Sequence, residues 1–381
     1  AESGKLRSYK RTIKHGNPGI MRGRQDPILA PVTSLFDQAT PQFSQIDQIY
    51  TFVYNDNTKD YLLKNIFKAQ KESSLFGKWI TLKNIENLFL KYQEAFEIKH
   101  LGFSEQERPI YKLKIGKGKK KILLWSQMHG DESTATASIF DMINYLKTNK
   151  TILNNVTVHF IPMLNPDGAE LFTRRNAIGI DINRDALRLQ SPESQLLKKV
   201  RDSLDADFGF NLHDQSKYYN AKQTSKPATI SVLAPAFNVE KDINQTRGDA
   251  MRVTAKLNGV LQRYVKGQVG RYSDEFEPRA FGDNMQKWGT STILIESGGH
   301  FDDPEKQFIR KLNYVGILSA IEVIGSQSYL TIGLDKYLSI PKNDRKLFDL
   351  KIDNLTFSYL GLNFTVDLGI NHHEIENKKH S

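Results

Sequence analysis

Apolar and polar positions alternate in two ways along the middle of the chain, and the two patterns predict strands and helices in turn. Short unbroken apolar runs are typical of strands buried on both faces. Longer stretches with apolar residues three and four positions apart predict amphipathic helices. The expected strands are 122–125, 156–163, 208–212, 230–234 and 292–295, and the expected helices are 134–146, 192–204, 247–264 and 304–324. Strands and helices in alternation predict an α/β sheet covered by helices on both faces.

The regions on either side of this alternation have different patterns. Apolar spacings of three and four between 58 and 98 predict short amphipathic helices. Beyond Gly325, segments rich in Thr, Tyr, Phe and Val predict strands at 329–333, 347–351, 355–359 and 363–367. A β-rich segment this short is only marginally stable by itself, and we therefore expect it to pack on the main domain. These patterns predict an irregular lead-in over 1–48, a main domain over 49–327 and a small β-rich C-terminal segment over 328–381.

The composition excludes several kinds of chemistry. The 381 residues contain no cysteine, which excludes disulfides, Fe–S clusters, Cys-ligated zinc and thiol nucleophiles. Any metal must be held by carboxylates and the nine histidines. Because no apolar run approaches the ~20 residues that span a bilayer, we expect no membrane insertion.

The net charge of +10 is unevenly distributed along the chain. Residues 1–24 hold seven Lys/Arg against one Glu, a balance of +6, so the other residues carry +4. This basic stretch has no apolar period, which predicts a tail without a packed structure rather than a binding element. It also lacks the hydrophobic core of a secretory signal, and the compartment stays open. We expect no nucleic-acid partner, since no aromatic residues are interleaved with the basic run at 117–121.

The first candidate for chemistry is the His-Gly-Asp-Glu motif that directly follows the expected strand at 122–125. Ligands in open α/β folds bind at the carboxyl ends of strands. The three-residue spacing lets His129 and Glu132 converge on one ion, and His213 ends another expected strand. Two His and one Glu form one type of catalytic zinc site. Alone, the motif is equally typical of a capped helix start.

Other polar residues could complete a site around such a metal. Glu296 ends the expected strand at 292–295, where it either turns out to solvent or accepts a proton. Asn183 and Arg184 could together hold a carboxylate. Arg174 or Arg175 could stabilise a developing oxyanion. Singly, each arginine is more typical of a surface ion pair.

Together these motifs resemble a known family, the zinc carboxypeptidases (M14 metallopeptidases). The resemblance extends over about residues 100–325 and depends on five motifs in the right order. They are His129-x-x-Glu132, Asn165-Pro166-Asp167-Gly168, Arg174-x-Asn176-Ala177-x-Gly179-x-Asp181-x-Asn183-Arg184, His213 and Glu296.

The resemblance implies a fold, a cofactor and an activity. The fold would be a three-layer α/β/α sandwich around a mixed sheet of about eight strands. One zinc ion per chain would be held by His129, Glu132 and His213, with Glu296 as the general base. The expected activity is hydrolysis of a C-terminal peptide or peptide-like amide bond, so the main domain would be a zinc peptidase domain.

The resemblance also assigns the substrate contacts. Asn183 and Arg184 would hold the free carboxylate of a peptide or peptide-like substrate, and Arg174, rather than Arg175, would polarise the scissile carbonyl. Tyr272 is the nearest match to the mobile tyrosine of the digestive members, although it matches loosely. The expected specificity segment, 271–283, mixes basic and acidic residues, so neither a purely apolar nor a purely basic preference follows.

Two other functions remain open from the sequence. The first is a zinc amide hydrolase that removes an acyl group from N-acyl amino acids. The second is a non-catalytic zinc- or peptide-binding module. A serine hydrolase is disfavoured because the chain has no Gly-x-Ser-x-Gly motif.

Overall fold

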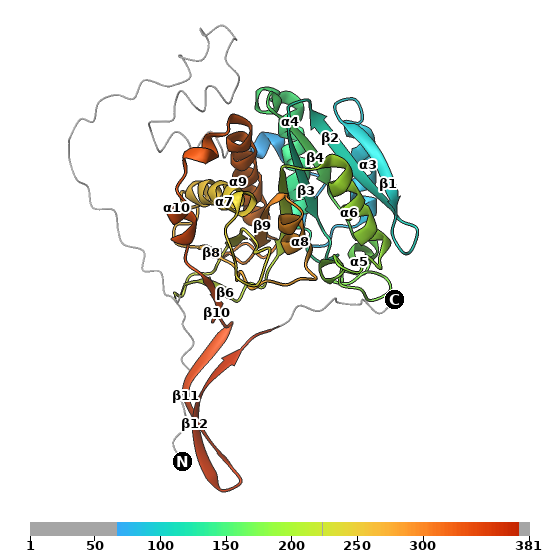
Figure 1. Ribbon diagram of the computed structural model, residues 1–381. Helices are drawn as coiled ribbons and strands as arrows, with labels where there is room; N and C mark the ends of the chain where they lie inside the picture. The colour runs from blue at the N-terminus through green and yellow to red at the C-terminus, as the bar shows by residue number, and fades with distance from the viewer. Residues whose placement is uncertain (1–66, 223, 373–381) are drawn as a thin grey trace, which may run out of the picture. The chain divides into compact units, whose positions relative to one another are not determined.

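The computed structural model describes residues 67–222 and 224–372, whose centre is an eight-stranded mixed sheet (Figure 1). The strand order is β1-β2-β4-β3-β5-β9-β7-β8. The strands are β1 (Glu97–Phe103), β2 (Pro109–Gly116), β3 (Lys120–Ser126), β4 (Val156–Ile161), β5 (Phe208–Asp214), β7 (Ile230–Leu233), β8 (Val269–Arg271) and β9 (Ser291–Ser297). The central run β4-β3-β5-β9 is parallel, and β1, β2 and β7 introduce antiparallel pairs.

Helices cover both faces of this sheet (Figure 1). They are α3 (Leu82–Tyr92), α4 (Thr134–Thr148), α5 (Pro166–Glu170), α6 (Pro192–Leu204), α7 (Gln245–Leu261), α8 (Phe281–Lys287) and α9 (Gln307–Ser326). Strand β3 shows the layering, because Ile122 and Leu124 join the core formed with α4, α7 and α9. Leu123 and Trp125 join a second core that contains Leu197 of α6 and residues of α8. The predicted three-layer sandwich around a mixed sheet is therefore confirmed.

The expected strands and helices of the central alternation are all present, with ends that differ by a few residues. Helix α6 begins where expected, and the Ser191 hydroxyl accepts a hydrogen bond from the Ser194 backbone N–H. Strands β1 and β2 were missed, since their half-covered surfaces alternate and do not form apolar runs. The motif at 165–168 forms the start of α5, where the Asn165 side chain accepts a hydrogen bond from the Gly168 backbone N–H at 2.9 Å.

The C-terminal segment differs from the prediction at its start. Residues 329–333 are not a strand: Ser328–Thr331 is a 3-10 turn, and α10 (Leu334–Leu338) follows. Tyr329 is buried with its ring 5.4 Å from that of Phe208, so contacts with the main domain outweigh a local β preference. Beyond α10, strand β10 (Asn343–Arg345) pairs with β6 (Tyr219–Ala221).

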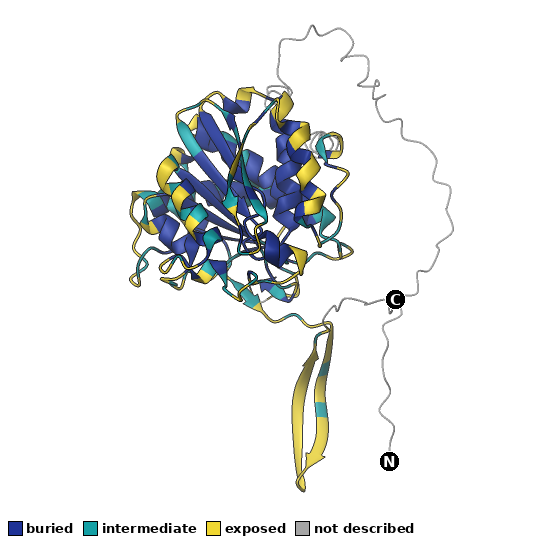
Figure 2. Ribbon diagram, turned by 90° about the vertical axis from the view of Figure 1, so that its right-hand side faces the viewer, coloured by how far each residue is buried: buried dark blue, intermediate teal, exposed yellow. Residues whose placement is uncertain are grey.

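The two last strands form an amphipathic hairpin that the prediction placed wrongly against the main domain. Strands β11 (Leu350–Tyr359) and β12 (Leu362–Ile370) pair with each other, and within the described residues they form a separate two-stranded sheet. Nearly every residue of both strands is exposed (Figure 2). Phe357 and Phe364 are among the exposed residues. The predicted strands at 347–351 and 355–359 correspond to one strand, β11, and the strand predicted at 363–367 lies within β12. Local sequence does not specify what covers the apolar face of such a hairpin.

The predicted lead-in at 1–48 and the start of the main domain at 49 lie outside the described residues. The boundary at 328 stays a prediction. Among the residues that the structure describes, no helix is long and apolar enough to span a membrane.

Candidate metal centre

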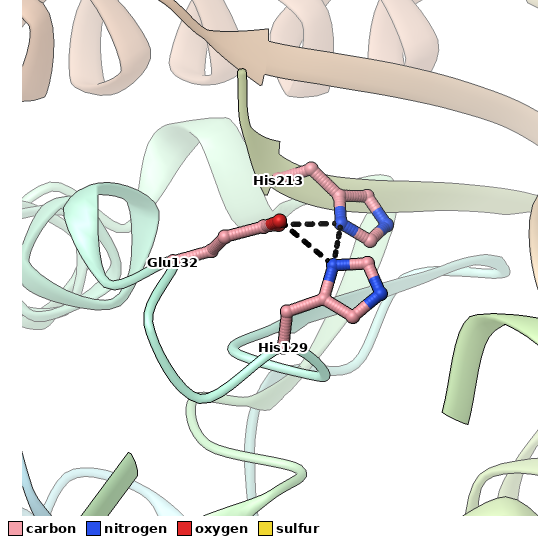
Figure 3. Close-up of side chains that lie close together, drawn as sticks. All are labelled: His129, Glu132 and His213. Carbon is pink, nitrogen blue, oxygen red and sulfur yellow. Dashed lines mark hydrogen bonds and ion pairs between the residues drawn. The ribbon is translucent and has the colours of Figure 1, made fainter. Parts of the chain in front are cut away.

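Three side chains from two parts of the sheet meet at its carboxyl edge (Figure 3). His129 and Glu132 lie in the turn between β3 and α4, and His213 lies near the end of β5, two strands that are parallel neighbours. All three residues are buried. The turn approaches α5 closely at Gly130, where a Cβ atom would lie 1.9 Å from the carbonyl carbon of Gly168. Only glycine allows this approach, so the backbone contact holds the two turn ligands in place.

The donor atoms of these residues face one another. The Glu132 carboxylate lies 2.8 Å from the Nδ1 atoms of both His129 and His213, and the two Nδ1 atoms are 3.1 Å apart. One ligand atom from each residue lies within 4.8 Å of the others. Ligands bound at ~2.1 Å around a tetrahedral zinc lie about 3.4 Å apart, so this donor set fits the ion. The three residues form a candidate metal site.

Asp181 and Arg174 surround this site. The His129 Nε2 atom lies 3.1 Å from the Asp181 carboxylate, and such a contact fixes the orientation of a ligating imidazole. The other Asp181 oxygen accepts a hydrogen bond from Arg174 Nε at 3.0 Å, and an Arg174 terminal nitrogen lies 3.2 Å from Glu132. Burial lowers the pKa of His129, but Glu132 and Asp181 outweigh it and raise that pKa to about 9.

Glu296 lies directly opposite His213, because β5 and β9 are parallel neighbours with these residues in register. Burial raises the pKa of Glu296 well above its ordinary value, and the nearby charge of Glu132 raises it further. The side chain therefore lies at the same edge of the sheet as the candidate metal ligands.

The candidate metal ligands open onto a cavity of about 350 Å³. The predicted site residues that line it are His129, Glu132, Arg174, Asn183, Arg184, His213, Tyr272 and Glu296. In this structure Arg184 forms an ion pair with Glu277 at 3.5 Å, and Asn183 accepts a hydrogen bond from the Phe281 backbone N–H. Burial, followed by the charge of Glu296, raises the pKa of Tyr272.

Other lining residues were not expected from the sequence. Asn211 precedes His213 by two positions on β5, so the period of a strand could have placed it on the same face. Arg345 lines the cavity from β10, and no local signal in the C-terminal segment indicated that. His300 lies beside Thr229 and Phe308 and is not among the residues that line the cavity.

Comparisons with known proteins point to one family. Residues 81–265 match the model of the family described as zinc carboxypeptidase. Carboxypeptidase SOL1 of Arabidopsis thaliana is 30% identical over 125 residues, or 25% of this chain and 26% of that protein. Probable carboxypeptidase 2 of Trichophyton verrucosum is 24% identical over 137 residues, or 34% of this chain and 26% of that protein. The matches span about a quarter of the length of these curated relatives.

Solved structures share the fold at low identity. A metallo-carboxypeptidase from Burkholderia cenocepacia has a TM-score of 0.53 and 17% identity, covering 65% of this chain and 69% of that one. Bovine thrombin-activatable fibrinolysis inhibitor, in complex with tick carboxypeptidase inhibitor, has a TM-score of 0.55 and 15% identity, covering 68% and 99%.

Fold and site together define a metallo-carboxypeptidase-like α/β domain. The matches confirm the resemblance that the motifs indicated: residues 81–265 match the zinc carboxypeptidase family, and the solved metallo-carboxypeptidases share the fold. The family match includes the three candidate metal ligands and ends before Glu296.

Proposed function

We propose that this protein is a zinc-dependent metallocarboxypeptidase that hydrolyses the C-terminal amide bond of a peptide or peptide-like substrate. The observation that carries the proposal is the convergence of His129, Glu132 and His213 within 4.8 Å, in a cavity that Glu296 and Arg184 also line. Metal ligands, a proton acceptor and a carboxylate-binding group in one cavity are what this reaction needs.

One zinc ion per chain would be held by His129, Glu132 and His213. When bound, the ion supplies Lewis-acid activation of water and of the scissile carbonyl. Glu296 accepts the proton of the attacking water and then delivers it to the leaving amine. Its register opposite His213 and its place in the lining of the same cavity support this role.

The remaining residues bind and orient the substrate. Asn183 and Arg184 would hold the terminal carboxylate, which replaces Glu277 as the partner of the Arg184 guanidinium. Arg174 would donate to the oxyanion that develops as the amide carbonyl is attacked. Tyr272, which lines the cavity, would contact one side of the substrate's terminal residue.

The proposal is tested by removing the base and, separately, the metal. Glu296→Gln should lower kcat on C-terminally free peptides by at least about 10²-fold, because the amide cannot accept a proton. The variant should keep its zinc content, and chelation should abolish wild-type hydrolysis until zinc is restored. Glu86→Gln, the same change on the exposed side of α3, is the matched control and should be as active as the wild type.

Other outcomes would assign a different function. Hydrolysis that survives both changes, in protein without zinc, would reject the proposal. Activity on N-acyl amino acids but not on peptides would indicate the related amide hydrolase. Tight binding of an intact peptide by the zinc-loaded protein, with no cleavage, would indicate a binding module.

A further inference from the structure

The cavity continues into the domain past the level of the metal ligands and Glu296. Asn211 and Leu294 pair directly on β5 and β9, as His213 and Glu296 do two residues further along. Side chains two residues apart lie on the same face of a strand, about 6.6 Å from each other. Asn211 and Leu294 therefore form a floor one side-chain row deeper than the catalytic edge, and both line the cavity.

Asn211 is an unsatisfied polar group at this floor. Its side chain is only 2% exposed, and its Oδ1 atom has no hydrogen-bond partner among the described residues. A buried carbonyl oxygen without a partner is costly, and such groups in folded proteins usually serve a ligand or a water. Since the side chain lines the cavity, its missing partner can enter from there.

The walls around this amide are apolar and leave space for a long side chain. Leu233 and Pro235 line the cavity beside Leu294, and all three are buried. Gly282 lies opposite Asn211, where a Cβ atom would approach Asn211 Nδ2 to 3.3 Å and Pro235 Cγ to 3.4 Å. Gly282 does not have a positive φ, so the backbone does not require glycine there. Its effect is to keep the floor open.

Two acidic residues that line the cavity, Glu275 and Glu277, are ion-paired, and a third, Asp283, accepts a hydrogen bond from the Glu277 backbone N–H. Glu275 forms an ion pair with Lys241, and Glu277 pairs with Arg279 and Arg184. A charged side chain that reached the floor would lose its water and meet a neutral amide between apolar walls, which is unfavourable for either sign.

We propose that the cavity selects a C-terminal residue whose side chain is uncharged and ends in a hydrogen-bonding group, best of all a carboxamide as in glutamine. Asn211 is the specificity-determining residue, and Gly282 admits the side chain to it. The methylene groups of glutamine would contact Leu233 and Leu294, and its amide would pair with that of Asn211. A carboxamide both donates and accepts, so the two amides are complementary in either orientation. This inference rests on the proposed function, because it takes the substrate's terminal residue as the occupant.

A panel of peptides that differ only in the last residue tests the inference. We compare kcat/KM for peptides ending in Gln, Leu, Lys or Glu, using the zinc-loaded wild type and Asn211→Leu, a change of similar size without polar atoms. The wild type should prefer Gln. The Asn211→Leu variant should lose about 10²-fold on Gln while keeping or gaining activity on Leu, because its floor is apolar.

A second variant protects the test against a folding defect. Gly282→Ala narrows the entrance to the floor and should reduce activity on Gln and Leu while preserving activity on a peptide ending in Ala. Equal losses on all peptides in both variants, or a wild type that prefers Leu, Lys or Glu, would overturn the inference.

A binding measurement separates this inference from the proposed function. Calorimetry on zinc-loaded Glu296→Gln should give tighter binding of the Gln peptide than of the Leu peptide. If the wild type cleaves none of the peptides but this preference is present, the proposed function fails and the assignment of the pocket stands. If peptides are cleaved without any preference among them, the inference alone fails.

Discussion

Arg174 and Arg175 are adjacent in the chain, yet only one of them lines the cavity. Arg174 contacts Asp181 and Glu132, whereas exposed Arg175 donates to the backbone oxygen of Gly179. Asp181 accepts from both Arg174 and His129, so it positions a proposed metal ligand and a proposed oxyanion donor together. The residue type alone could not distinguish the two arginines, because both can donate to an oxyanion.

This difference gives a matched pair of variants. Arg174→Ala should lower kcat on peptides by about 10²–10³-fold, the usual cost of removing a donor to a developing oxyanion. Arg175→Ala should leave kcat unchanged. Steady-state kinetics on one peptide decides between them, and the reverse order of effects would move the oxyanion role to Arg175.

At the scale of elements, pairing and register assemble the site. Strands β3, β5 and β9 are consecutive parallel neighbours, so the residues at their carboxyl ends meet at one edge. The hairpin β11–β12 is the opposite case, because its strands have good local patterns but no described layer against their apolar face. Strands of the same type thus differ in how much packing against the rest of the chain stabilises them.

We expect this difference to appear in amide hydrogen exchange. A two-stranded sheet alone is marginally stable in water, so amides of β11 and β12 should exchange through local opening, faster than those of β5. Mass spectrometry of peptides from both regions measures the difference, and β5 is the internal control. Protection in the hairpin equal to that of β5 would show that another surface covers its apolar face.

At the scale of the whole molecule, a buried histidine on β4 links stability to pH. Burial, with the charges of Lys112 and Lys114, lowers the pKa of His159 from its ordinary value to about 4. Between about pH 4 and 6.5 the unfolded chain therefore binds a proton at this residue that the folded chain does not. The free energy of unfolding due to His159 must rise with pH across this window and fall as the solution is acidified.

Urea unfolding of the wild type and of His159→Met checks this expectation. Between pH 7 and pH 4 the free energy of unfolding should fall by on the order of 3 kcal/mol more for the wild type than for the variant, since methionine does not titrate. His100→Gln, a change on β1, which β2 separates from β4, is the control and should retain the pH dependence that is due to His159. Parallel curves for the wild type and His159→Met would contradict the assignment.

Local sequence was sufficient to predict an element wherever the pattern within that one segment indicated its type. The apolar runs gave the central strands because strands covered on both faces must be apolar throughout, and Ser191-Pro192 marked the start of α6. The ordered motifs indicated the family resemblance and the candidate site residues, because ligand chemistry restricts residue type and spacing. Half-covered β1 and β2 lacked such a signal.

What the sequence determined by itself is therefore the class of chemistry: which side chains can hold a metal, accept a proton or hold a carboxylate. The tertiary structure alone decided which of them meet. It placed Arg174 in the cavity, placed Asn211 beneath His213, brought Arg345 to the cavity from a distant strand and left the hairpin without a described covering layer. Such outcomes depend on packing between segments far apart in the chain, and packing energy is a property of the pair of surfaces rather than of either segment.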